Sequence, residues 1–170
     1  MQTLGLTSRE HTPRRKMADK GGGISSISMA VARIAVGIMF LFFAEYKLVS
    51  TQFAREGYTH WVSGWAQETC VSFYKPFLYF TLQHPWVFGY AVGVVELLIG
   101  LSMVLGFWVR PFSVAGALLM LNMTLATWNL PAGTAAWRYL GNELDHIPLL
   151  LMFLMFFAHD AGKSLGLDGR

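Results

Sequence analysis

The stretch Trp86–Leu105 decides the fold, and it reads WVFGYAVGVVELLIGLSMVL. It is strongly apolar, and its only charged residue is Glu96, which lies at its middle. A hydrocarbon core about 30 Å thick needs about 20 apolar residues in a helix, and Glu96 would lie roughly 15 Å from the start of that helix. An ionisable group at such a depth is costly and normally faces protein. We therefore predict a membrane span whose glutamate has a partner inside the protein.

Three further apolar runs, at about residues 28–48, 111–128 and 140–159, occupy most of the remaining chain. Hydrophobic residues make up 54% of the 170 residues and charged residues only 14%, whereas soluble domains contain roughly 25% charged residues. The mean hydropathy is +0.44. The sequence predicts an all-α integral membrane protein with one four-helix bundle over residues 28–160.

Basic residues gather on one side of these spans, before the first span and in the turn between the second and third: Arg9, Arg14, Arg15, Lys16, Lys20 and Arg110. Positive charge favours the cytoplasmic side of a membrane. We therefore expect both termini to be cytoplasmic, including a tail at 161–170, in a multi-pass protein of a bacterial-type inner membrane.

Residues 1–27 form a polar, basic segment that ends in three glycines and predicts a flexible cytoplasmic arm. Its charges favour contact with anionic lipid head groups. A neighbouring subunit is the alternative partner, and Arg14, Arg15 and Lys16 are the candidate contact residues.

The connection at 49–85 is long and aromatic, with Trp61 and Trp65 one helical turn apart. This spacing predicts one or two short amphipathic helices lying in the outer membrane interface, where tryptophan is enriched. Three readings stay open for Trp61 and Trp65: an aromatic belt that anchors the bundle, a surface that binds a partner protein, or the rim of a lipid-side pocket.

Small residues share a helix face with Glu96 at Gly89, Gly93 and Gly100, which predicts close packing of this face against another helix. Asn122 lies at a similar depth in the third span. We expect a hydrogen bond between Glu96 and Asn122, with a neutral carboxyl. Arg33 lies near one end of the first span and is expected to extend to the membrane surface.

A second group of polar residues is expected near the outer ends of the first and last spans: Glu45, Lys47, Asp145 and His146. Two acids, a lysine and a histidine in a partly dry site provide the donors and titratable carboxyls that a quinone site needs. An interhelical salt-bridge network would use the same residues. The sequence leaves both interpretations open, with Glu96 and Asn122 as further members of the cluster.

Cys70 is the only cysteine, which excludes an internal disulfide and an iron–sulfur cluster held by this chain alone. Metal-ligand spacings, phosphate-binding loops and nucleophile motifs are absent from the sequence, and we expect neither a metal nor a nucleic-acid partner. His84 and His146 are weak candidates for a pigment ligand. A quinone, a pigment or a lipid could bind at the bundle surface without a cofactor motif.

Three segments together resemble the DoxX-like membrane proteins. They are ARIAVGIMFLF at 32–42 followed by Lys47, GVVELLIG at 93–100 followed by Arg110, and AGKSLGLD at 161–168. The resemblance implies a four-span bundle and an association with membrane redox chemistry, because one branch of the family is a subunit of thiosulfate:quinone oxidoreductase. Glu45 departs from the small residue that is usual in the family.

From these observations we expect a small accessory subunit of a larger respiratory or photosynthetic electron-transfer complex, in contact with other integral membrane subunits and not an enzyme on its own. A quinone-reactive oxidoreductase subunit is the alternative. A small proton or solute transporter built around Glu96 is the third interpretation.

Overall fold

The computed structural model describes residues 15–130, 133–135, 137–138 and 146–169, and all regular secondary structure in these ranges is helical. Within these ranges three helices are long and apolar enough to cross a membrane, Ser26–Val49, Pro85–Leu105 and Val109–Thr127. The elements, in chain order, are α1 (Arg15–Val49), η1 (Phe53–Gly57), α2 (Tyr58–Glu68), η2 (Ser72–Tyr74), α3 (Lys75–Leu82), α4 (Pro85–Leu105), α5 (Val109–Thr127), α7 (His146–Ala158), η3 (Ala161–Lys163) and η4 (Leu167–Gly169). The predicted all-helical membrane bundle is confirmed.

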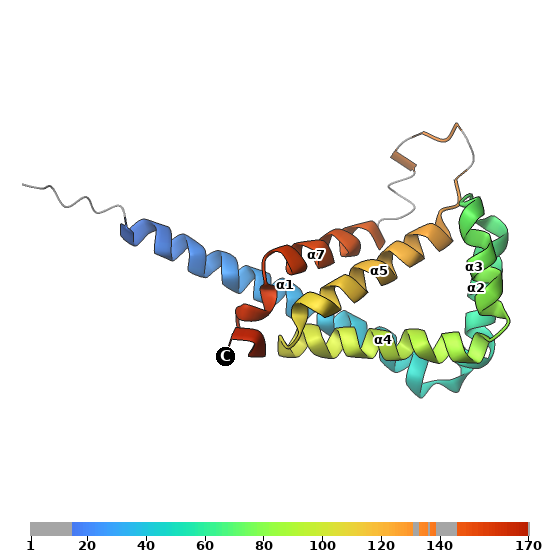
Figure 1. Ribbon diagram of the computed structural model, residues 1–170, viewed down its shortest axis with the longest axis horizontal. Helices are drawn as coiled ribbons and strands as arrows, with labels where there is room; N and C mark the ends of the chain where they lie inside the picture. The colour runs from blue at the N-terminus through green and yellow to red at the C-terminus, as the bar shows by residue number, and fades with distance from the viewer. Residues whose placement is uncertain (1–14, 131–132, 136, 139–145, 170) are drawn as a thin grey trace, which may run out of the picture.

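The fourth predicted span appears as α7, a helix of 13 residues and therefore about 20 Å long. Residues 139–145 lie outside the described part of the chain, so the predicted start of this span near residue 140 is not described. In Figure 1, α7 lies beside α5, and Phe153 packs onto the face of α5 where Gly116 leaves room for its ring. Phe153 and Phe156 are fully buried in the main core cluster.

Helices α1 and α4 form the second pair, and they pack closely because glycines line their contact. A side-chain carbon added at Gly100 would lie 2.8 Å from Leu41, and one added at Gly93 would lie 2.9 Å from Leu48. From α1, Gly37 gives the same close approach to Met103. The predicted packing face of α4 is therefore confirmed, and the helix that it meets is α1.

The connection between α1 and α4 folds into helices, as predicted from its aromatic spacing. Helices α2 and α3 run across one end of the bundle (Figure 1). Thr69 ties this segment to the end of α5, because its hydroxyl donates to the Leu125 carbonyl at 2.9 Å. The neighbouring amide of Cys70 donates to the Trp128 carbonyl at 2.8 Å. We call this the α2–α3 end.

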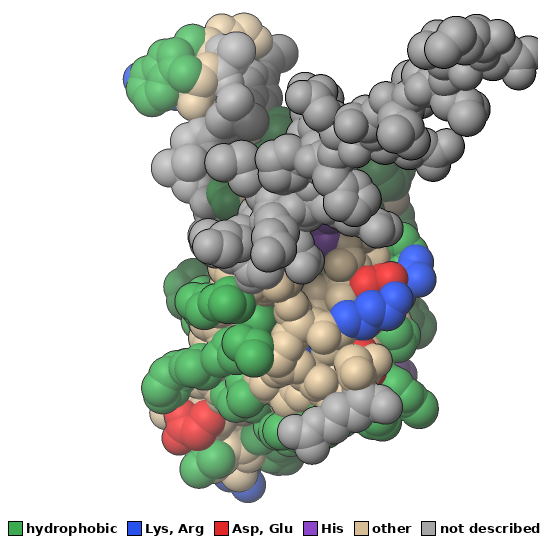
Figure 2. Space-filling view, turned by 90° about the vertical axis from the view of Figure 1, so that its left-hand side faces the viewer, with side chains coloured by type: hydrophobic (Ala, Val, Ile, Leu, Met, Phe, Trp, Pro, Cys, Tyr) green, Lys and Arg blue, Asp and Glu red, His purple; other side chains and the backbone are tan. Residues whose placement is uncertain are grey.

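The opposite end of the bundle, which we call the turn end, is closed by the segment after α7. Asp168 accepts hydrogen bonds from the backbone amides of Trp108 and Val109, at 2.8 and 3.0 Å, where α5 begins. Gly106 ends α4 with φ +66°, and the Asp168 amide donates to its carbonyl at 2.9 Å. Figure 2 faces this end and shows acidic and basic side chains side by side at its rim.

Two sequence predictions are wrong in this half of the molecule. Residues 15–27, predicted as part of a flexible arm, are helical and continuous with the first span. Arg33 does not extend to the surface. It is fully buried, and its guanidinium lies against Gly106 and Gly166 and donates to the Leu165 carbonyl at 3.2 Å. The segment after α7 covers the path by which Arg33 would reach the surface.

Candidate functional site

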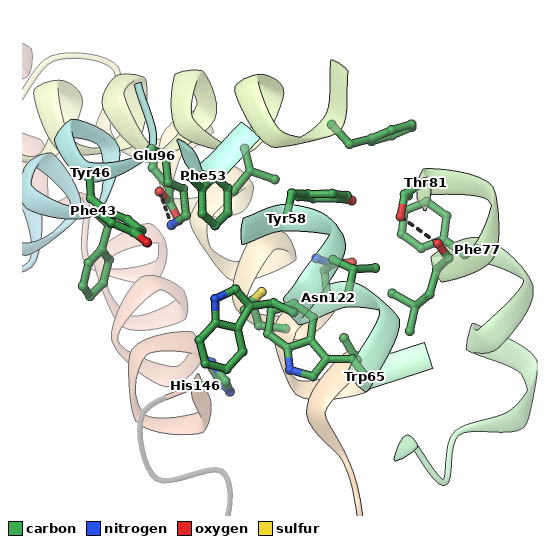
Figure 3. Close-up of a pocket in the computed structure, with 18 residues that line it drawn as sticks. Phe43, Tyr46, Phe53, Tyr58, Trp65, Phe77, Thr81, Glu96, Asn122 and His146 are labelled. Atoms are coloured by element: carbon green, nitrogen blue, oxygen red, sulfur yellow. Dashed lines mark hydrogen bonds and ion pairs between the residues drawn. The ribbon is translucent and has the colours of Figure 1, made fainter. Parts of the chain in front are cut away.

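A cavity of about 440 Å³ lies at the α2–α3 end of the bundle, and α1, η1, α2, α3, α4, α5 and α7 contribute to its wall. The residues that line it are Phe43, Tyr46, Lys47, Phe53, Tyr58, Trp61, Val62, Trp65, Phe77, Leu78, Thr81, Phe88, Val92, Glu96, Asn122, Met123, Ala126 and His146. Most are aromatic or aliphatic, and a few polar groups interrupt them (Figure 3). This composition and size are typical of a small-molecule site.

The strongest polar feature of the wall is an ion pair between α1 and α4. Lys47 Nζ lies 2.6 Å from Glu96 Oε1 and 2.7 Å from Oε2 (Figure 3). The side chains are 17% and 7% exposed, respectively. The predicted hydrogen bond between Glu96 and Asn122 is therefore wrong, because α4 packs its glutamate face on α1 and the carboxylate meets a lysine there.

Aromatic rings flank the ammonium group on two sides. Lys47 Nζ lies 5.6 Å from the centre of the Phe43 ring and 5.4 Å from that of Phe53. The negative face of an aromatic ring attracts a cation at such distances. Phe53 begins the π-helix η1, a form of helix that is frequent at functional sites. The carboxylate and the two rings together hold the lysine at the cavity wall.

Asn122 belongs to a second polar pair, with Tyr74. The Tyr74 hydroxyl donates to Asn122 Oδ1, which links η2 to α5. Burial, together with the neighbouring Tyr58, raises the pKa of Tyr74 to about 12. Burial also raises the pKa of Tyr58. Both phenols therefore stay protonated at neutral pH and act as hydrogen-bond donors.

His146 reaches the cavity from the first residue of α7. Its Nδ1 lies 3.5 Å from the Thr127 hydroxyl at the end of α5. Figure 3 places the imidazole on the side of the cavity away from Tyr58. An imidazole at this position can donate or accept a hydrogen bond, depending on its tautomer.

The structure brings together Lys47, Glu96, Asn122 and His146 from the predicted cluster. Glu45 is exposed on α1 and is not a lining residue, because it lies two residues from Lys47 and so on another face of the helix. Asp145 lies outside the described residues. The structure thus separates the predicted cluster into a cavity group and a surface acid.

The other predicted binding residues are distributed over the molecule. Trp61 and Trp65, proposed as partner contacts, line the cavity. His84 is exposed at the start of α4 and does not line it. Arg15 and Lys16 belong to the first turn of α1, and Arg14 is outside the described residues.

Sequence reasoning missed the Phe43 ring beside Lys47 and the role of Tyr74. Phe43 precedes Lys47 by one helical turn, and this spacing could have indicated a ring beside the ammonium. Tyr74 stands in the aromatic run 73–80 with only its hydroxyl as a polar signal. Nothing in the sequence pairs it with Asn122, 48 residues away.

Comparison with known proteins supports the resemblance that the motifs indicate. The model of the DoxX family matches residues 28–129, which contain α4, α5 and the whole Lys47–Glu96 pair. The chain belongs to the DoxX family. No curated protein and no solved structure matches this DoxX-family chain.

The arrangement can hold a flat, apolar molecule that has hydrogen-bond acceptors on its rim. The aromatic walls fit the flat faces, and Lys47, Asn122 and His146 offer polar contacts. The described residues contain no group of three or more His, Cys, Asp or Glu side chains that could hold a metal ion. The polar side chains of the wall, such as Lys47 and His146, can take part in hydrogen bonding and proton transfer.

Proposed function

We propose that this DoxX-family protein binds the head group of a membrane quinone in the cavity at the α2–α3 end, as one subunit of a membrane electron-transfer assembly. The observation that supports this most directly is the Lys47–Glu96 ion pair in the wall of an aromatic cavity. A quinone ring is flat and apolar, with two carbonyl oxygens that accept hydrogen bonds. A charged donor among aromatic side chains matches both properties.

In this proposal the protein handles the quinone and its protons, and another redox subunit exchanges the electrons. Reduction of a quinone consumes two electrons and two protons and converts both carbonyls into hydroxyls. Lys47 donates a hydrogen bond to one carbonyl oxygen, at which a proton is needed as the electrons arrive. Glu96, which contacts Lys47 through both oxygens, keeps the lysine side chain in place.

A structural accessory role in the same kind of assembly is the second candidate. The large apolar side chains on the outside of the spans support it, for example Phe42 and Leu118, which are exposed in the single chain. Either lipid or a transmembrane helix of a neighbouring subunit could cover these side chains. In this case the cavity would be filled by lipid, and quinone would not bind to it specifically.

Equilibrium binding to the purified full chain in lipid nanodiscs tests the proposal. Quinones quench tryptophan fluorescence, and Trp61 and Trp65 form part of the cavity wall. We expect saturable quenching by a short-chain benzoquinone or naphthoquinone. Lys47→Met/Glu96→Leu removes both charges together and should weaken binding about ten-fold or more, the magnitude of a hydrogen bond to a charged group.

Two variants serve as controls. Glu45→Gln changes an exposed carboxyl two residues from Lys47 and should leave the affinity unchanged. Trp108→Phe removes an indole at the turn end and should leave the saturable part of the quenching intact. Absence of saturable binding in the wild type would overturn the proposal. Co-purification of the wild type with a redox subunit would then support the structural role.

A further inference from the structure

We propose that Tyr74 is a positioning residue that turns the carboxamide of Asn122 so that its NH₂ group faces the cavity, and that the site thereby selects the oxidised form of its ligand. The inference rests on the proposed function, since it assigns a redox preference to the same site. Tyr74 acts through Asn122, because Asn122 is a lining residue and Tyr74 is not.

The hydrogen bond between these residues determines which end of the amide the ligand meets. A carboxamide has an oxygen that accepts and an NH₂ group that donates. The Tyr74 hydroxyl donates to Oδ1, and the structure gives Asn122 no other side-chain hydrogen bond within its described residues. The NH₂ group is therefore the part of the amide that is free to contact a molecule in the cavity.

Tyr74 is held in this position by its surroundings. Its amide donates to the Val71 carbonyl at 3.0 Å, and its ring lies 5.2 Å from that of Phe77, which is itself a lining residue. The preceding loop is fixed by Thr69, whose hydroxyl donates to Leu125. Leu125 lies three residues beyond Asn122 on the same helix, so the loop and Asn122 keep their relative position.

The protonation state of Tyr74 supports the same direction of the hydrogen bond. Burial raises the pKa of Tyr74 to about 12, so its hydroxyl keeps its hydrogen at any physiological pH. A phenol with its hydrogen donates to an amide oxygen, and this favours one orientation of the amide over the flipped one. A phenylalanine at this position would leave both orientations accessible.

This orientation gives the cavity a preference between the two redox states of a quinone. Lys47 and the Asn122 NH₂ group both donate hydrogen bonds, and the carbonyl oxygens of a quinone accept them. A quinol has hydroxyl hydrogens that need acceptors, and Asn122 Oδ1 is already engaged with Tyr74. At Asn122 the wall should therefore favour a quinone carbonyl over a quinol hydroxyl, because a hydroxyl hydrogen that meets the NH₂ group has no acceptor there.

The test is the ratio of quinol to quinone dissociation constants, measured by calorimetry on the full chain in nanodiscs with the quinol kept reduced under argon. The wild type should favour the quinone. Tyr74→Phe should lower this ratio roughly three- to ten-fold, the effect expected of one neutral hydrogen bond. Tyr79→Phe removes a hydroxyl from an exposed tyrosine of α3 and is the matched control.

Variants at Asn122 separate the positioning effect of Tyr74 from a general effect on folding. In Asn122→Leu, which has no amide to orient, Tyr74→Phe should leave the ratio unchanged. Asn122→Asp places acceptors at the cavity wall regardless of Tyr74 and should shift the preference toward the quinol. This variant gives a result even if Tyr74→Phe does not fold.

The outcomes distinguish the two proposals. If the wild type binds neither form, the proposed function and the role of Tyr74 both fail. If the wild type binds quinone but Tyr74→Phe keeps its ratio, or changes it equally in the Asn122→Leu background, only the positioning role of Tyr74 is overturned. If Tyr74→Phe lowers the ratio when Asn122 is present and not in the Asn122→Leu background, the positioning role of Tyr74 is supported.

Discussion

Helix α1 carries one basic side chain toward each end of the bundle, Lys47 partly buried and Arg33 fully buried, and the two have opposite surroundings. Lys47 at the α2–α3 end has a carboxylate, two aromatic rings and a cavity beside it. Arg33 at the turn end has a single hydrogen bond, to a carbonyl, and its Nε and Nη1 have no hydrogen-bond partner within the described residues. Glycine backbone fills the space around its guanidinium.

The Lys47 charge is accessible from the cavity, whereas the Arg33 charge is enclosed by the protein. Lys47 keeps some exposure to a cavity in which another molecule could reach it. Arg33 is covered by the segment after α7, and a ligand would have to displace Gly106 and Gly166 to contact it. The same helix thus lines the cavity at one end and contributes to closure of the fold at the other.

The largest effect should come from removing the partner of Lys47. Glu96→Leu leaves a mostly buried ammonium without its carboxylate, which should lower the free energy of unfolding by about 3–5 kcal/mol. Thermal unfolding in mild detergent measures this loss. Lys47→Met/Glu96→Leu should recover most of it, and Glu45→Gln should have no effect. Equal stability of Glu96→Leu and the wild type would show that the pair is not the main polar contact of the α2–α3 end.

The next largest effect should come from the turn end, by adding a methyl group at Gly106. This residue has φ +66°, and the new carbon would overlap the Arg33 guanidinium and the backbone of Gly166. The left-handed conformation and the overlap together should destabilise Gly106→Ala by about 2–4 kcal/mol. Thermal unfolding gives the value, and quinone binding per folded molecule should stay at its wild-type level.

Gly64→Ala is the matched control for this substitution. Gly64 lies in α2 with no atom within 4 Å of the added carbon, so alanine should be neutral or stabilising there, by up to about 1 kcal/mol. Equal stability of the Gly106 and Gly64 variants would contradict the tight enclosure of Arg33.

A smaller effect should follow from removing the cap of α5. Asp168→Ala leaves the amides of Trp108 and Val109 without their acceptor, which should cost about 1 kcal/mol, the value of a lost helix cap. Hydrogen exchange at these two amides should become faster, while exchange in α2 stays the same. Unchanged hydrogen exchange at the Val109 amide would show that Asp168 does not cap α5 in the membrane.

The smallest effect concerns the exposed charges around Asp160. Its hydrogen bond to Lys163 and the nearby Arg110 lower the pKa of this carboxyl. Because the folded-state pKa is the lower one, the stabilisation is present above the ordinary value and is lost as the pH falls through the folded value. A carboxyl titration by NMR should show the lowered pKa. It should return toward its ordinary value in Lys163→Ala, and an unchanged value would rule out this contact.

The sequence predicted the spans and the packing face of α4 because both depend on local regularities. Apolar length alone identifies α4 and α5, and the glycine spacing around Glu96 marks the face that meets another helix. Neither regularity says which helix that is. Equal depth indicates Asn122 as the partner of Glu96 only on the assumption that all spans begin at common planes.

That assumption fails at Lys47. The lysine is two residues from the end of α1, yet it contacts Glu96, which lies at the middle of α4. Helix α4 therefore extends beyond the end of α1, and η1 fills this space, with Ala54 against Gly89. The sequence contains no local signal for this offset, because it arises from how the connection 49–85 folds back on the bundle. The cavity lies at this offset, so its wall could not be assembled from span depths.

The cap of α5 by Asp168 also has a consequence for biosynthesis. The acceptor is separated from the Trp108 amide by 60 residues. At about 5–20 residues per second, a ribosome takes roughly 3–12 s to synthesise that length. During this interval the helical hairpin of α4 and α5 enters the membrane with the start of α5 uncapped. A translocon or chaperone that contacts this hairpin has several seconds in which its turn is open, and the arrival of Asp168 ends that period.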